Sequence, residues 1–240
     1  MTTKIIVHGA AGRMGRNIIR LADAYDEIRI VAAMVRQGSR LTGQNCPENK
    51  AISYVEELDD EHHCDVLIDF SSDEGTQHAL QAAKKFSKAF LTGTTALSEN
   101  TLHMMRQLAK TKPVLAAPNT SRGISLMRKF MAQTAESARD ADISIVEAHR
   151  REKKDAPSGT ALLLAQVIRA AGAEMKKENI FSLRGGDVAG EHTVRFALPG
   201  EYLEITHRAT GPEVFAHGAL RAAVRLHHLL PGLYAMEDVL

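Results

Sequence analysis

The N-terminal end of the chain carries the feature that most limits its possible folds, a short strand followed by a glycine turn and a helix. The run from Lys4 to His8 is rich in β-branched residues. Glycines follow at positions 9, 12 and 15, and apolar residues then recur at helical spacing. Glycine is needed where the backbone turns sharply and a pyrophosphate approaches the start of a helix. The pattern predicts a dinucleotide-binding strand–turn–helix unit. A tight turn without a ligand is the alternative.

A second strand is predicted at residues 28–34, and it ends where such folds place the residue that reads the adenosine ribose. Proteins that bind NAD usually have Asp or Glu there, whereas a 2′-phosphate requires a cation. This chain has Val35-Arg36, and Arg40, Arg13 or Arg16 could add positive charge. We therefore expect NADPH to be preferred over NADH. If Arg36 is only a solvated loop residue, the preference stays open.

Strands and helices then alternate along the first half of the chain, after a looser stretch at 37–61 that we interpret as loop with short pieces of structure. The expected strands are residues 65–70, 89–92 and 113–117, and the expected helices are 73–85 and 98–110. Alternation of this length predicts an α/β fold with a Rossmann-like, doubly wound parallel sheet. The strand ends read Gly-Ala-Ala-Gly, Phe-Ser-Ser, Gly-Thr-Thr and Pro-Asn-Thr-Ser, which suit backbone and hydroxyl contacts to a cofactor.

The second half has a different pattern, with strands grouped after a pair of helices. A helix is expected to about residue 139, and the later strands at 180–184, 192–197 and 201–207, with Pro199-Gly200 as a hairpin turn and a last helix at 215–230. This order predicts an α+β domain with an open mixed sheet. We expect a dinucleotide-binding domain at 1–119, joined by 220–240, and a substrate-binding and oligomerisation domain at 120–219.

Polar chemistry is concentrated between a strand at 143–146 and a helix at 161–171. His149 titrates near neutral pH, Lys153 is a cation, and Gly159 and Thr160 offer backbone N–H groups at a helix start, which binds carboxylate or phosphate oxygens. The segment can also be explained as a solvated basic loop in which Ser158 only caps the helix.

Composition limits the partners. The formal net charge is +1 and no apolar run is long enough to span a membrane, so neither nucleic acid nor a membrane is expected as a partner. The two cysteines form no C-x-x-C pair, and the adjacent residues of His62-His63-Cys64 cannot all face one ion. We expect no metal site and a cytoplasmic protein.

Across essentially its whole length the chain resembles the bacterial dihydrodipicolinate reductase family. The resemblance is carried by Gly9 to Gly15 with its Gly-Arg-Met-Gly ending, Asp69-Phe70-Ser71-Ser72, Gly93-Thr94-Thr95, Ala117-Pro118-Asn119 with Ser121 and Gly123, Glu147-Ala148-His149, Lys153-x-Asp155-Ala156-Pro157-Ser158-Gly159-Thr160-Ala161, Gly190-Glu191-His192-Thr193 and Leu203-Glu204-Ile205-Thr206-His207. The Asp-Ala-Pro-Ser-Gly-Thr segment is the most specific of these motifs.

The resemblance implies that a cyclic dicarboxylate, 4-hydroxy-tetrahydrodipicolinate, is reduced to tetrahydrodipicolinate by NADPH or NADH in lysine and diaminopimelate synthesis. It implies that His149 is the general acid, that Lys153 assists, and that a homotetramer forms through the second domain's sheet. The substrate would be bound by Arg150, Ser158, Gly159 and Thr160. The cofactor would be bound by Gly9, Ala11, Gly12, Arg13, Met14, Gly15, Arg36, Phe70, Gly93, Thr94, Thr95, Ala117, Pro118, Asn119 and Thr120.

The chain departs from the family pattern at four places, one of which is the absence of a ribose-reading carboxylate at Val35-Arg36. Arg150 stands where the family has a second histidine, Thr120 where an aromatic residue is common, and Gly211-Pro212 where a Ser-Arg pair is common. Two other functions therefore stay open: reduction of another imine or carbonyl, and dinucleotide sensing without catalysis. A sensor needs neither His149 nor Lys153. No Tyr-x-x-x-Lys motif occurs, which excludes a short-chain dehydrogenase.

Overall fold

The computed structural model describes residues 2–239, and the chain divides into two compact units. The first unit consists of Met1–Ser121 and Phe215–Leu240, and the second of Arg122–Val214. Each unit has its own hydrophobic core.

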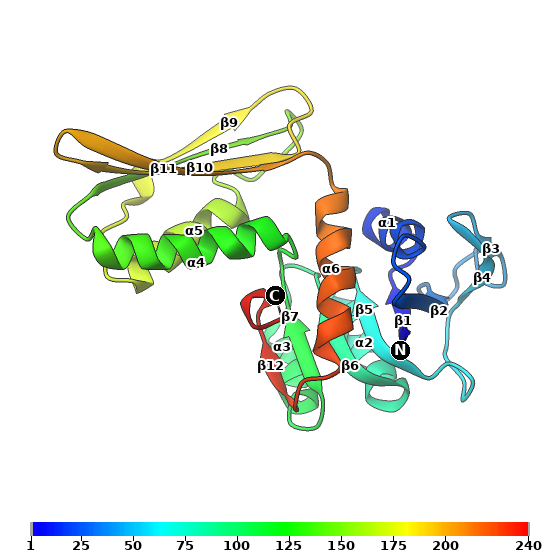
Figure 1. Cartoon of the computed structure of the whole chain (residues 1–240). Coiled ribbons are helices and arrows are strands. Elements are labelled where there is room, and N and C mark those ends of the chain that lie inside the picture. The colour runs from blue at the N-terminus through cyan, green and yellow to red at the C-terminus, as the bar shows by residue number, and fades with distance from the viewer. Residues whose placement is uncertain (1, 240) are drawn as a thin grey trace. The chain divides into compact units, whose positions relative to one another are not determined.

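The first unit is built on an eight-stranded sheet with the strand order β12-β7-β6-β5-β1-β2-β4-β3 (Figure 1). Every neighbouring pair is parallel except β3 and β4. The strands are β1 Thr3–His8, β2 Ile28–Met34, β3 Asn45–Cys46, β4 Asn49–Val55, β5 Cys64–Asp69, β6 Ser87–Thr92, β7 Pro113–Ala116 and β12 Gly232–Tyr234. The predicted doubly wound parallel sheet is confirmed.

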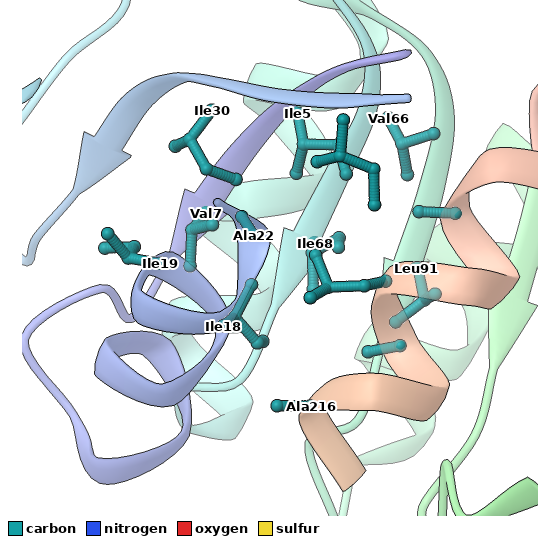
Figure 2. Close-up of a cluster of buried hydrophobic side chains, with 14 of the residues drawn as sticks. Ile5, Val7, Ile18, Ile19, Ala22, Ile30, Val66, Ile68, Leu91 and Ala216 are labelled. Atoms are coloured by element: carbon teal, nitrogen blue, oxygen red, sulfur yellow. The ribbon is translucent and has the colours of Figure 1, made fainter. Parts of the chain in front are cut away.

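Helices cover both faces of this sheet, because successive residues of a buried strand point to opposite sides. Ile5 and Val7 pack in one core with residues of α1 and α6, whereas Ile6 packs in another with residues of α2 and α3. Figure 2 shows the first of these cores, where Ile18 of α1 and Ala216 of α6 lie with side chains from the strands. The helices are α1 Arg13–Ala22, α2 Asp73–Phe86, α3 Glu99–Leu108, α6 Glu213–Leu226 and the 3₁₀ turn η2 Met236–Asp238.

The stretch at 37–61 is more ordered than the sequence suggested. Strand β4 lies in it and pairs with β2 only through Ala33 with Tyr54 and Met34 with Val55. Ile52 and Tyr54 are buried while the residues between and before them are exposed, so β4 follows a two-residue period. Its polar composition concealed this period. The three-residue strand β12 was also missed, because it is too short to show any period.

The second unit has a four-stranded mixed sheet with the order β11-β10-β8-β9. Strand β10 is antiparallel to both β8 and β11, and β9 is parallel to β8. The strands are β8 Asp142–His149, β9 Ile180–Arg184, β10 Gly190–Leu198 and β11 Glu201–Ala209. The predicted open mixed sheet is confirmed, and so is the hairpin at residues 199–200, where Gly200 has a φ of 82°.

One face of this second sheet is covered by α4 Arg122–Ser137 and α5 Gly159–Ala170 (Figure 1). Alternate residues of β8 are buried, and they include Ile143, Ile145, Glu147 and His149. The strand therefore directs two polar side chains to the same face as its core residues. The 3₁₀ turn η1 Lys177–Asn179 precedes β9. In the described part of the chain no helix is long and apolar enough to cross a membrane.

Candidate active site

The glycine turn borders a cavity of about 970 Å³ in the first unit. Five of the predicted cofactor residues line it, namely Gly9, Ala11, Gly12, Arg36 and Phe70. Val35 is buried beside it, whereas Arg36 is exposed. The structure therefore gathers the glycine turn and the arginine after β2 around one space.

Two of the glycines are required by close packing. Gly9 has a φ of 73°, and a Cβ added to it would collide with the carbonyl oxygen of Phe70. A Cβ on Gly15 would collide with the carbonyl oxygen of Gly9, since α1 starts directly against the turn. Glycine alone combines the positive φ with this approach. Gly9 and Gly12 also line the cavity, so a dinucleotide whose pyrophosphate approaches their backbone fits this turn.

The other predicted cofactor residues lie outside the lining of this cavity. Arg13 is exposed, Met14 is half-buried, and Gly93 packs beneath the ring of Phe70. Among those at the ends of β6 and β7, Thr95 and Pro118 are exposed, while Ala117 and Thr120 are buried.

Two of the residues after β7 have their polar atoms engaged. Asn119 accepts a hydrogen bond from the Ser121 backbone through Oδ1 at 2.9 Å. Thr120 donates its hydroxyl hydrogen to the carbonyl of Phe215 at 2.7 Å.

A buried carboxylate that the sequence interpretation had given no role lies at the end of β5. Asp69 bonds to Nδ1 of His8 at 2.8 Å, and it accepts hydrogen bonds from four hydroxyl groups at 2.6–2.9 Å. The hydroxyls belong to Ser71, Thr76, Thr92 and Thr94. Burial acts to raise the pKa of Asp69, but the hydrogen bonds from His8 and the hydroxyls hold it below its usual range. Thr94, a predicted cofactor residue, thus belongs to this network.

In the second unit, a second buried carboxylate holds the predicted acid. Glu147 has no exposed surface, and its Oε2 lies 2.5 Å from Nδ1 of His149. Arg184 bonds both carboxylate oxygens, at 2.7 and 2.9 Å, and the backbone N–H of Ser158 donates at 3.2 Å. Burial acts to raise the pKa of Glu147, but hydrogen bonds from Arg184, Ser182 and His149 lower it to about 2. Glu147 is therefore ionised at neutral pH.

His149 is buried, and this burial lowers its pKa. The carboxylate of Glu147 acts in the opposite direction, while the charges of Lys153 and Arg184 add to the lowering. The ring of His192 meets it edge-on, with centroids 5.2 Å apart. His192 is also buried, and burial followed by the nearby His149 lowers its pKa to about 4. The imidazole of His149 thus lies directly against the ion pair of Glu147 with Arg184.

The loop after β8 carries the remaining predicted site residues. Lys153 forms an ion pair with Asp155 at 2.8 Å, and Arg150 is exposed. Ser158 caps α5 through its hydroxyl, which accepts from the Ala161 backbone at 3.2 Å and lies 3.2 Å from Nε2 of His192. The bond between Ala156 and Pro157 is cis.

Two residues at the start of α5 complete that set. Gly159 is exposed, with nothing near an added Cβ, so its backbone is accessible at the helix start. Thr160 is half-buried one residue further along.

Glu147 and Arg184 were not predicted from the sequence as partners of the His149 site. Glu147 could have been found, because it alternates with His149 on one face of a strand. Arg184 lies 37 positions from Glu147, and only the parallel pairing of β8 with β9 brings it there. Among residues 2–239, no group of three or more His, Cys, Asp or Glu side chains is arranged to hold a metal ion.

Comparison with known proteins agrees with this architecture. The family model described as dihydrodipicolinate reductase, N-terminus, matches residues 3–120, and the C-terminus model matches 123–240. A protein of Hahella chejuensis named 4-hydroxy-tetrahydrodipicolinate reductase is 40% identical, over 99% of this chain and 98% of its own length. A protein of the same name from Nitratiruptor sp. is 38% identical, over 98% of this chain and 97% of its own length.

Solved structures show the same fold. The dipicolinate-bound dihydrodipicolinate reductase of Paenisporosarcina sp. TG-14 has a TM-score of 0.84 at 21% identity, with both chains covered fully. The C. glutamicum DAP dehydrogenase in complex with DAP has a TM-score of 0.63 at 13% identity, covering 100% of this chain and 95% of its own. The two family models together cover almost the whole chain, and so do the relatives at about 40% identity. The chain therefore belongs to the dihydrodipicolinate reductase family.

Proposed function

We propose that this chain reduces 4-hydroxy-tetrahydrodipicolinate to tetrahydrodipicolinate with NAD(P)H, as a step in lysine and diaminopimelate synthesis. The relatives at about 40% identity bear the name of this activity. The observation that carries the proposal is the buried imidazole of His149, held by the ionised Glu147 beside Lys153. A proton donor with a fixed orientation next to a cation is what reduction of a conjugated imine needs.

In the proposed reaction the substrate loses water and then gains a hydride and a proton. When bound along the glycine turn, NAD(P)H would provide the hydride for a ring carbon. Negative charge then develops along the C=C–C=N system, and His149 donates the proton that neutralises it. Lys153 offsets the developing charge and holds a substrate carboxylate, while its neighbour Asp155 keeps the ammonium in place at 2.8 Å.

The start of α5 is proposed to bind a carboxylate of the substrate. Gly159 and Thr160 lie in the first turn of α5, and the backbone N–H groups of a helix start favour anions. Gly159 is exposed, so an anion can approach its backbone. Ser158 shapes this turn as the cap, and Arg150, which is exposed, would bind a carboxylate without exchanging a proton.

The test is an assay of NAD(P)H oxidation with freshly generated 4-hydroxy-tetrahydrodipicolinate. Replacing His149 with Gln should lower turnover by about 10²-fold or more, because the general acid is lost, and leave dinucleotide binding intact. His103→Gln, at an exposed position of α3, is the matched control and should turn over normally. Unchanged turnover in His149→Gln would remove this residue from the mechanism. Inactivity of the wild-type chain would favour another imine or carbonyl substrate, with Arg150 marking the change.

We propose that the pyridine nucleotide lies along the glycine turn of residues 9–15 and that NADPH is preferred. The support is the cavity shared by that turn and Arg36, with no carboxylate at positions 35 and 36 to repel a 2′-phosphate. Gly93, Thr94, Thr95 and the segment at 117–120 would hold the nicotinamide ribose and carboxamide.

This preference is measured as kcat/KM for the two cofactors at one salt concentration. Arg36→Ala should lower kcat/KM for NADPH by about 10-fold and change NADH little, since one ion pair to a phosphate is lost. The exposed Arg106, outside the cavity, provides the control Arg106→Ala. A clear NADH preference in the wild-type protein would refute the assignment.

We also propose a homotetramer formed through the open face of the second sheet. Large apolar side chains of β9 and β11 are exposed on that face, with Phe181 at 52%, Leu183 at 57% and Tyr202 at 62%. Exposed apolar groups gathered on a sheet favour burial against another copy. Light scattering on the purified chain measures the mass, and a monomer at micromolar concentration would contradict this assembly.

A further inference from the structure

The acid site contains a hydrogen bond that determines which nitrogen of His149 is free. Its Nδ1 lies 2.5 Å from Oε2 of Glu147. An ionised carboxylate can only accept hydrogen bonds, so Nδ1 must carry a hydrogen in both the neutral and the charged imidazole. The proton that the ring exchanges is therefore the one on Nε2.

Gly190, at the start of β10, lies beside this second nitrogen. A Cβ added to Gly190 would lie 3.1 Å from Nε2 of His149, which is tighter than ordinary contact. Any larger residue at position 190 would crowd this atom. Glycine at the start of β10 thus leaves Nε2 uncovered on that side.

Arg184 explains how a carboxylate can stay ionised in this place. Glu147 is fully buried, and a buried charge needs a partner of opposite charge. The guanidinium of Arg184 bonds both of its oxygens, and it also donates to the backbone carbonyl of Asp155 at 2.6 Å. Because Arg184 compensates the charge of Glu147, His149 does not have to be protonated for that purpose.

We propose that Glu147 is the positioning residue of the acid site: it holds His149 as the Nδ1–H tautomer, so that Nε2 faces the substrate, and Arg184 balances its charge. This inference rests on the proposed role of His149 as general acid. It adds two residues, from β8 and β9, to the machinery of the reaction.

Charged and titratable groups face His149 from several elements. Glu147 lies on its own strand, Arg184 on β9, His192 on β10 and Lys153 in the loop after β8. His207 on β11 acts on His192. Glu147 raises the pKa of His149, whereas burial and the two cations lower it. Removing the carboxylate charge should therefore lower the pKa of His149 further.

The first test needs no change to the site. Nitrogen-15 NMR of the full-length chain labelled at histidine distinguishes the two neutral tautomers, and the spectrum of His149→Gln identifies the signal of this residue. We expect the Nδ1–H tautomer at a pH where His149 is neutral. The Nε2–H tautomer would overturn the proposal even if every variant of Glu147 failed to fold.

The second test is the pH profile of kcat/KM. In Glu147→Gln, kcat/KM at pH 7.5 should fall roughly 10-fold, and the descending limb should move to lower pH, because the acid loses its proton sooner. Glu147→Asp keeps the charge and should restore the position of the limb. Glu174→Gln, an exposed glutamate of the same unit, should change neither.

These outcomes separate the two proposals. If His149→Gln turns over normally, the proposed function loses its acid. If His149→Gln is impaired but Glu147→Gln keeps the wild-type limb, only the role of Glu147 is overturned.

Discussion

Each unit buries one carboxylate against Nδ1 of a histidine, but the two carboxylates are balanced in different ways. Asp69 in the first unit has His8 and four hydroxyl donors, whereas Glu147 in the second has His149 and both arms of Arg184. Both carboxylates have no exposed surface. The difference is that Glu147 is paired with a permanently charged side chain, Arg184, whereas Asp69 is held by an imidazole and hydroxyl groups.

Hydroxyl donors satisfy a buried carboxylate without neutralising it. The hydroxyls around Asp69 belong to α2, to the end of β6 and to the turns after β5 and β6, so that this network ties several strand ends together beside the cavity. Arg184 balances the charge of Glu147, so His149 can be neutral without leaving the buried carboxylate without a cation. The first network suits holding a shape, and the second suits proton transfer.

The largest expected effect comes from removing the fixed cation. Arg184→Met should lower the free energy of unfolding by about 3–5 kcal/mol, because the buried carboxylate of Glu147 is left without its cationic partner. Urea unfolding measures it, with Arg151→Met, an exposed arginine of the nearby loop, as control. A loss below about 1 kcal/mol, as for a surface ion pair, would show that Arg184 does not balance the buried charge.

A smaller effect is expected at the hydroxyl network. Asp69→Asn retains one acceptor oxygen, and the hydroxyls can rotate toward other partners, so the free energy of unfolding should fall by about 1–3 kcal/mol. The control is Asp60→Asn, whose carboxylate is almost fully exposed. If Asp69→Asn costs as much as Arg184→Met, the two centres are not different in kind.

The smallest expected effect is a slope of stability against pH in the second unit. His192 has its pKa lowered from about 6.5 to about 4, so the unfolded chain takes up the proton first and stability is lost as pH falls through that range. Glu147, whose pKa is lowered from 4.5 to about 2, adds a loss between those values. His192→Gln should flatten the upper part of the slope. Unfolding midpoints of both proteins are measured from pH 7 to pH 3. The same slope in His192→Gln as in the wild type would show that His192 is not involved.

Much of the fold follows from local patterns in the sequence. The glycine turn, the alternation of strands with helices and the hairpin at 199–200 could all be predicted, because hydrophobic period and backbone sterics act over a few residues. Strand β4 could not, since it joins the sheet through two residue pairs and alternates polar side chains with Ile52 and Tyr54. His149, Lys153 and the start of α5 were found as a site through their motif, and their roles stay predictions.

By itself the sequence determined the two kinds of architecture, the family to which the chain belongs, and the closeness of His149 and Lys153 along the chain. Only the tertiary structure decided what surrounds them. Asp69 meets His8 across 61 positions, and Glu147 meets Arg184 across 37, through the parallel pairing of strands. Strand register is set by the packing of whole sheets, so no short-range pattern in the sequence could have predicted either pair.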